Sequence, residues 1–156
     1  MGSSVLSIEE AIAEVAADVD AMFDALLAVP SDARAKLFEA MRHAAMGGGK
    51  RLRPLLVIAT ASIFNVARTQ SIRAGTAVEA IHVYSLVHDD LPCMDDDDLR
   101  RGKPTVHKAF DEATAVLAGD SLHALAFEIL SDPETHPDPF TRGEMIATLA
   151  KASGPD

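Results

Sequence analysis

Apolar residues recur at steps of three and four along most of the chain, which is the period of an α-helix and not of a strand. The first such segment follows the capping-box pair Ser7 and Glu10 and should end at Pro30. Ser31 is a candidate cap for the second segment, which should stop at the glycine run 47–49. We expect six helices, at about residues 8–29, 32–46, 54–64, 69 or 71–90, 105 or 111–130 and 139–153. The predicted fold is therefore an all-α antiparallel bundle with short loops.

Two features of this pattern carry structural expectations of their own. The third predicted helix opens with Pro54 and is apolar on most sides, so it should be buried. Gly119 lies inside the fifth predicted helix, where a glycine costs about 1 kcal/mol relative to alanine, and a close helix crossing would explain it. Residues 95–104 are expected to form a polar loop.

Composition narrows the class of protein. The 156 residues are 48% apolar, enough for one domain with a core, and the formal net charge of -10 argues against a general nucleic-acid binder. Cys93 is the only cysteine, so the chain can form no intrachain disulfide, and a reducing cytoplasmic compartment fits. We expect no membrane span, because no apolar run approaches the ~20 residues required. Residues 1–6 lack the features of a signal peptide and should be disordered or originate from cloning.

A basic turn at residues 47–54 is the first candidate for chemistry. Lys50, Arg51 and Arg53 follow three glycines and lead into a helix, an arrangement that suits a bound phosphate. It is not a nucleotide-binding P-loop, because that pattern needs a glycine at Ala44 and a serine or threonine at Arg51. A helix stop followed by solvated basic residues is the simpler alternative.

An acidic segment is the second candidate. Six carboxylates lie within residues 89–98, and such neighbours repel unless solvent or a cation neutralises them. Mg²⁺ prefers oxygen ligands and commonly takes one or two carboxylates together with substrate phosphates. An EF-hand is disfavoured, because the segment contains no glycine and lacks the alternating ligand pattern. Metal ligation and a solvated loop both stay open for Asp96, Asp97 and Asp98.

Three further cations follow in residues 100–105. If the carboxylates hold a metal and the metal holds a phosphate, Arg100 and Arg101 can bind the remaining phosphate oxygens; surface salt bridges are the simpler account. His82 precedes Asp89 by two helical turns, about 10 Å on one face, which makes His82 a further candidate. The histidines without such an alignment are expected to be structural or solvated: His43, His107, His123 and His136.

The three segments 48–54, 85–98 and 100–105, in this order, resemble the trans-polyprenyl diphosphate synthase family, and most closely its bacterial farnesyl diphosphate synthase type. The resemblance covers about residues 35–132, and the acidic segment resembles the family's first aspartate-rich motif in the form with two extra residues. It implies an isoprenoid synthase fold. It also implies Mg²⁺-dependent head-to-tail condensation of an allylic diphosphate with isopentenyl diphosphate.

The resemblance also implies roles for individual residues. Asp89 and Asp95 would bind Mg²⁺, with Asp90 in the same motif, and Arg100 would hold the allylic diphosphate. The residues that would hold isopentenyl diphosphate are Lys50, Arg53, His82 and Arg101. Tyr84 and its neighbour Ser85 lie one turn before Asp89, and Tyr84 would be the floor that limits the product to C15, with C20 as the alternative. A homodimer is implied, with the apolar faces of the fourth and fifth helices as candidate interfaces.

The chain also departs from the family. A second aspartate-rich motif and a Lys-Thr pair that contacts the allylic substrate are both absent, so the bundle resembles only the N-terminal part of the enzyme. We therefore expect the 156-residue chain to be inactive alone. Two alternatives remain: a catalytically silent partner subunit of a heteromeric prenyl synthase, or an HD-type metal phosphohydrolase built on His88 and Asp89 with His43 and Asp120.

Overall fold

The computed structural model describes residues 7–155, and the expectation for residues 1–6 lies outside this part of the chain. The described part is helical almost throughout, which confirms the predicted all-α class. Its elements are α1 (Ile8–Leu26), α2 (Ala35–Ala45), α3 (Leu52–Ile63), α4 (Arg68–Asp89), β1 (Leu99–Arg100), β2 (Lys103–Pro104), α5 (Val106–Ala109), α6 (Glu112–Ser131) and α7 (Pro139–Ala152).

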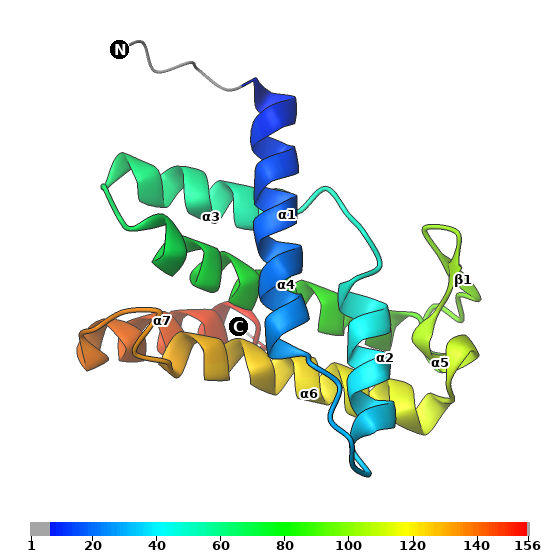
Figure 1. The fold of residues 1–156 in the computed structure, drawn as a ribbon. Coiled ribbons are helices and arrows are strands. Elements are labelled where there is room, and N and C mark those ends of the chain that lie inside the picture. The colour runs from blue at the N-terminus through cyan, green and yellow to red at the C-terminus, as the bar shows by residue number, and fades with distance from the viewer. Residues whose placement is uncertain (1–6, 156) are drawn as a thin grey trace.

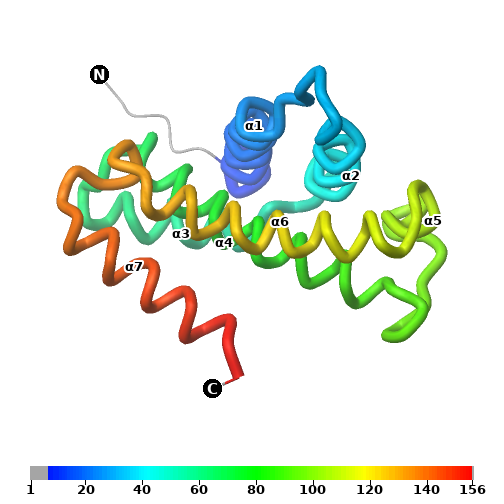
Figure 2. Tube along the Cα trace, turned by 90° about the horizontal axis from the view of Figure 1, so that it is seen from below, coloured from blue at the N-terminus to red at the C-terminus, as the bar shows by residue number. Residues whose placement is uncertain are grey.

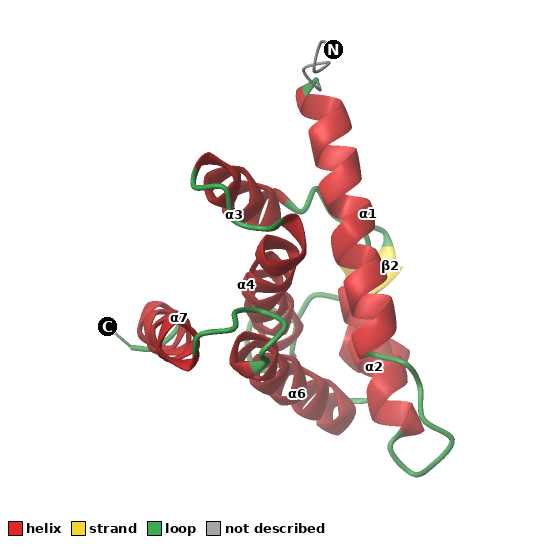
Figure 3. Ribbon diagram, turned by 60° about the vertical axis from the view of Figure 1, so that its left-hand side comes forward, coloured by secondary structure: helices red, strands yellow, loops and turns green. Residues whose placement is uncertain are grey.

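The two longest central helices, α4 and α6, lie side by side (Figure 3) and share the most extensive helix contact. Figure 2 shows α1 and α2 crossing one side of this pair, while α7 lies on the opposite side. α3 packs beside the first half of α4 and also contacts α1. The β1–β2 hairpin and α5 gather at the end where α4 stops and α6 begins (Figure 1). This end of the bundle therefore carries the acidic segment and residues 100–105, which are two of the three candidate segments.

Helix starts follow local hydrogen bonding, and one prediction was wrong. The capping box is present, with Ser7 N donating to Glu10 over 2.8 Å and Glu10 N to Ser7 Oγ over 3.1 Å. Ser31, however, does not cap α2, which begins at Ala35. The Asp32 carboxylate accepts bonds from the backbone and side chain of Arg34, and this local turn delays the helix.

The fifth predicted helix is two helices. Thr105 precedes the single turn of α5, and Asp111 caps α6 by accepting a hydrogen bond from Thr114 N over 2.7 Å. Both of the predicted starting points are therefore used, one by each helix.

α3 is much more exposed than its composition predicted. Only Pro54 and Ile58 are buried, whereas Leu56 is 67% and Ile63 75% exposed. One face of α3 packs on α1 and α4, and no other element in residues 7–155 covers the remaining faces to any extent. A uniformly apolar helix need not be buried on all sides when its neighbours occupy only one.

Gly119 explains how closely α4 and α6 approach each other. A Cβ built on Gly119 would lie 2.2 Å from His88 Nε2, so the predicted close crossing is confirmed. α6 is also long and apolar enough to cross a membrane by length and composition, which the sequence analysis did not expect. Half of its most apolar window is buried in the fold, as in a core helix.

Candidate active site

The acidic segment folds back over the end of α4. Asp89 is the last residue of the helix and is half-buried, and the following Pro92 cannot continue the helical hydrogen bonds. Asp95 N donates to Asp89 O over 2.8 Å, and Asp96 N donates to Leu91 O over 3.1 Å. Asp89 and Asp95, the two predicted metal ligands, are thereby held close in space although six positions separate them in sequence.

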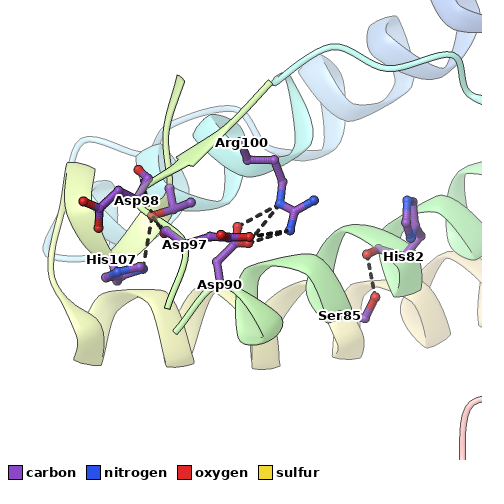
Figure 4. Close-up of polar contacts among 8 residues, drawn as sticks. His82, Ser85, Asp90, Asp97, Asp98, Arg100 and His107 are labelled. Atoms are coloured by element: carbon purple, nitrogen blue, oxygen red, sulfur yellow. Dashed lines mark hydrogen bonds and ion pairs between the residues drawn. The ribbon is translucent and has the colours of Figure 1, made fainter. Parts of the chain in front are cut away.

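Asp90 and Arg100 form the central ion pair of this end of the bundle. Arg100 donates from Nε to both Asp90 oxygens over 3.0 and 2.9 Å and from Nη2 to Oδ1 over 2.6 Å, as Figure 4 shows. Asp90 is buried, and its hydrogen-bonded carboxylate raises the pKa of Arg100 above its ordinary value. Asp90 therefore orients the guanidinium that was predicted to bind the allylic diphosphate.

The backbone carbonyl of Asp97 and the carboxylate of Asp98 tie the acidic segment to the hairpin and α5. The Thr105 hydroxyl donates to Asp97 O over 2.8 Å, and the buried His107 ring nitrogen Nδ1 lies 3.2 Å from the same hydroxyl. Lys108 pairs with Asp98 over 2.8 Å and lowers the pKa of that carboxyl. Thr105 and His107 were missed as site-supporting residues, although the predicted structural role of His107 agrees with this position.

Arg100 and Arg101 are adjacent in sequence but face different neighbours. Residues 95–104 do not form only a loop as predicted, because Arg100 pairs with Lys103 in a two-stranded antiparallel hairpin. Arg101 and Gly102 form its turn with φ of 52° and 78°, a left-handed pair that matches the twist of the strands. A Cβ built on Gly49 would lie 2.6 Å from Arg101 Nη1, so the Arg101 guanidinium closes over the glycine turn, away from the Asp90 that binds Arg100.

A cationic pocket lies between the glycine turn, α4 and the hairpin. It encloses about 820 Å³, including space open to solvent, and Glu79 is the one carboxylate among its lining residues. The structure brings together here all four residues predicted to hold isopentenyl diphosphate: Lys50, Arg53, His82 and Arg101.

The pKa of His82 is lowered by burial and by the positive charge of this pocket. Partial burial is the first cause that lowers its pKa, and the nearby cations Arg53, Arg101 and Arg100 lower it further, while Glu79 opposes them. His82 is thus neutral at pH 7 in a pocket with an excess of positive charge. Such a pocket is suited to an anion with several oxygens.

Arg51 differs from the other two cations of the basic turn, for which phosphate binding and solvation were both left open. It is only 3% exposed and points into the bundle, where Nη1 donates to Glu79 over 2.9 Å and Nη2 to Asp20 over 2.6 Å. The signal in the sequence was the position of Glu79 among the inward-facing residues of α4, where a carboxylate needs a cationic partner.

Tyr84 lies in an aromatic cluster between α4 and α6. Its ring contacts His88 and His123 edge-on, with centroid distances of 5.5 and 4.9 Å, and His123 contacts Phe127 at 5.2 Å. Ser85 donates to the carbonyl of His82 over 2.9 Å, so its hydroxyl is bonded to its own helix. Tyr84 is half-buried one turn below the acidic segment, in the region where the floor was expected.

Two residues of the HD-type alternative approach each other, with His88 Nε2 and Asp120 Oδ1 3.9 Å apart, but the two histidines also contact backbone carbonyls. His88 Nε2 lies 3.1 Å from Val116 O, and His43 Nε2 lies 2.8 Å from Pro104 O. Among residues 7–155, no group of three or more histidine, cysteine, aspartate or glutamate side chains gathers as a metal site. This geometry does not support an HD phosphohydrolase.

The carboxylates of Asp89 and Asp95 fit a Mg²⁺ site that a bound ligand completes. The charge of Asp89 contributes to raising the pKa of Arg100, and the backbone of Asp95 is bonded to Asp89, but two carboxylates are too few for an all-protein cage. Mg²⁺ characteristically completes its shell with water and substrate phosphate, so two carboxylates suffice when a diphosphate is present. The residues therefore fit a metal that is shared with a phosphorylated ligand.

A helical bundle with an aspartate-rich segment and a basic pocket at one end has the architecture of an isoprenoid synthase. The sequence signature described as "Polyprenyl synthetase" matches residues 34–153. The chain thus belongs to the polyprenyl synthetase family.

Individual relatives agree with this assignment. The chain is 56% identical to the farnesyl diphosphate synthase of Escherichia coli K12 over 118 residues, 74% of this chain and 39% of that protein. It is 49% identical over 129 residues to an Arabidopsis thaliana chloroplast protein named as the large subunit 1 of a heterodimeric geranylgeranyl pyrophosphate synthase, covering 81% of this chain and 35% of that protein. The crystal structure of an FPP/GFPP synthase from Zymomonas mobilis superposes with a TM-score of 0.90 at 64% identity, over 92% of this chain and 51% of that one. The chain thus spans between a third and a half of the length of these relatives.

Proposed function

We propose that this chain provides the diphosphate-binding part of a trans-prenyltransferase that joins isopentenyl diphosphate to an allylic diphosphate, dimethylallyl or geranyl. The observation that carries the proposal is the convergence of Lys50, Arg53, His82 and Arg101 in one pocket beside the Asp90–Arg100 pair. The pocket that contains Arg101 and the neighbouring Arg100 are two separate cationic positions. They suit two diphosphates, because each of these arginines can bind a different one.

In the proposed reaction, Arg100 binds the allylic diphosphate, and Asp90 fixes the direction of its guanidinium. The allylic C–O bond breaks, the electron pair leaves with pyrophosphate, and the positive side chains stabilise the charge that develops there. The double bond of isopentenyl diphosphate, held by Lys50, Arg53 and Arg101, then attacks the allylic cation, and loss of a proton completes the product. Apolar helix walls exclude the water that would quench the cation.

Asp89 and Asp95 are the residues proposed to hold Mg²⁺. When bound, the metal would supply charge neutralisation at the leaving diphosphate. Asp95 is exposed and Asp89 is half-buried, so both carboxylates would be accessible to a metal that binds together with the diphosphate.

Farnesyl diphosphate is the proposed product, and geranylgeranyl diphosphate is the alternative. The floor formed by Tyr84 supports the shorter product, since its ring packs with His88 and His123 across the α4–α6 pair. Similarity to the Arabidopsis subunit of a geranylgeranyl pyrophosphate synthase supports the alternatives of a longer product or a partner-subunit role. The complete first acidic motif favours a catalytic chain.

We further propose that the enzyme is a cytoplasmic homodimer. The apolar side chains of α4 are largely used inside the bundle, so the outer face of α6 is the better candidate interface, with Leu117 56% and Val116 40% exposed. Cys93 is a free, exposed thiol, in keeping with a reducing compartment.

Calorimetric titration of the 156-residue chain with inorganic pyrophosphate, with and without Mg²⁺, tests the proposed site. We expect binding that tightens markedly with Mg²⁺, because the metal bridges carboxylates and phosphate. Lys50→Gln and Arg53→Gln should each weaken binding, whereas the matched control Lys151→Gln, in the last turn of α7, should not. Equal affinity for wild type, Lys50→Gln and Arg53→Gln would contradict the proposal.

A further inference from the structure

Arg51 lies inside the segment that carries the pocket cations, but its own side chain points the opposite way. Lys50 and Arg53 on either side are exposed, whereas the Arg51 side chain is 1% exposed. Arg51 also adopts a left-handed backbone conformation, with φ 45° and ψ 40°, as the residue that caps α3. This conformation is disfavoured for a residue with a Cβ and persists only where surrounding contacts enforce it.

Three helices supply those contacts. The Arg51 guanidinium binds Asp20 of α1 over 2.6 Å, the carbonyl of Ala45 at the end of α2 over 2.5 Å and Glu79 of α4 over 2.9 Å. The ring of Phe23 lies below it, 5.6 Å from the guanidinium carbon. Nε and Nη2 share Asp20, Nη2 also binds the Ala45 carbonyl, and Nη1 binds Glu79. The single ammonium of a lysine cannot reproduce this arrangement.

Glu79 connects this anchor to the pocket. It lies one turn before His82 on α4 and lines the same cationic pocket, so one stretch of helix fixes Arg51 and also presents His82. The backbone turn at Arg51 sets where the chain enters α3, and hence where Lys50 and Arg53 lie relative to His82.

We propose that Arg51 is a positioning residue: its buried guanidinium, held by Asp20 and Glu79, fixes the left-handed turn that presents Lys50 and Arg53 to a diphosphate. The inference rests on the proposed function, since it presupposes that this pocket binds a diphosphate. Arg51 is among the residues that line the pocket, but its guanidinium is occupied by Asp20, Ala45 and Glu79 and is not free to bind a phosphate. Its effect is on affinity for the diphosphate in the cationic pocket.

Arg73 provides a matched control for a purely structural role. It is also buried, at 7% exposure, and each arm of its fork has its own partner: Thr135 at 2.9 Å, Glu134 at 2.9 Å and Asp132 at 2.6 Å. These partners lie in the connection between α6 and α7, and Arg73 does not line the cationic pocket. Replacing either arginine by lysine therefore disrupts a similar buried network, but only one of the two networks adjoins the pocket.

The experiment compares wild type, Arg51→Lys and Arg73→Lys of the 156-residue chain by thermal unfolding and by calorimetric titration with inorganic pyrophosphate and with isopentenyl diphosphate. Both variants should unfold at lower temperature than wild type. Arg51→Lys should weaken binding of both ligands by about tenfold or more, because displacement of contacting groups by about an ångström has a large effect, while Arg73→Lys should leave affinity unchanged. Unchanged affinity in Arg51→Lys, or an equal loss in Arg73→Lys, would overturn the proposal.

Two further measurements keep the outcome decisive. If Arg51→Lys does not fold, Asp20→Asn removes one charged partner of Arg51 outside the pocket and keeps a hydrogen-bond acceptor. It should weaken the binding of both ligands, and wild-type affinity in that variant overturns the inference. If Lys50→Gln binds pyrophosphate as tightly as wild type, the pocket assignment itself fails, and the inference fails with it. If Lys50→Gln weakens binding but Arg51→Lys and Asp20→Asn do not, only the positioning role fails.

Discussion

Replacing Gly119 by alanine tests whether the close approach of α4 and α6 is required by the fold. In an exposed helix interior, this change stabilises by about 1 kcal/mol, because glycine is the poorer helix former. At Gly119 the new methyl would lie 2.2 Å from Nε2 and 2.4 Å from Cδ2 of His88, so the His88 ring must move. Overpacking of this kind costs about 1–3 kcal/mol. Loss of the 3.1 Å contact between His88 and the carbonyl of Val116 adds about 0.5–1.5 kcal/mol.

The sum predicts that Gly119→Ala lowers the free energy of unfolding by about 0.5–3.5 kcal/mol. Gly143→Ala is the matched control, because Gly143 also lies within a helix and an added Cβ there meets nothing within 4 Å. That variant should gain about 1 kcal/mol. Urea unfolding followed by circular dichroism measures both changes at one pH and one temperature.

A double variant isolates the cause. In a His88→Ala background the steric conflict disappears, so adding Gly119→Ala should become neutral or stabilising. If Gly119→Ala stabilises the otherwise unchanged chain as much as Gly143→Ala does, the methyl is accommodated without cost. The reasoning from close approach would then be refuted.

Three further outcomes are expected. The 156-residue chain, given labelled isopentenyl and geranyl diphosphates with Mg²⁺, should release no prenyl product, and substantial turnover would contradict its role as part of an enzyme. In a catalytically active enzyme that contains this chain, Tyr84→Ala should shift the product towards C20 or longer, as chromatography of the products would show. An active variant with an unchanged product excludes Tyr84 as the floor. Because the fold lowers the pKa of His82, the unfolded chain binds more protons below about pH 6.5, so stability should fall as pH falls through that range. Urea unfolding of His82→Gln across the same range should show a weaker pH dependence than wild type.

The helical class and the grouping of site residues were predictable from the sequence because both rest on local patterns. The helical period of the apolar residues, together with glycine and proline breakers, located the long helices. The spacing from His82 to Asp89 placed both residues on one helix that ends at the acidic segment. The direction in which a side chain points could not be predicted equally well from the sequence. The basic turn gave no local indication that Arg51 points inward, because this depends on Asp20 and Glu79, which are 31 and 28 positions away.

The exposure of α3 was unpredictable for a related reason. Hydrophobicity describes what a helix could bury, but which neighbours are available depends on the whole arrangement, here only α1 and α4. The two-residue strands of the hairpin are too short to create a visible alternation, so they were read as loop.

The hairpin between Asp90 and the glycine turn has a consequence for how this region can change during evolution or engineering. Arg100 reaches Asp90 and Arg101 reaches the glycine turn because one is in the strand and the next is in a two-residue turn. Inserting a single residue between positions 98 and 100 would move Arg100 into the turn and Arg101 to the place of Gly102. Deleting one would move Arg101 into the strand and Arg100 to the place of Leu99, so neither change keeps both arginines at their partners. Substitutions can thus adjust each arginine separately, but the length of this segment is fixed, and variation in length should be confined to loops elsewhere in the chain.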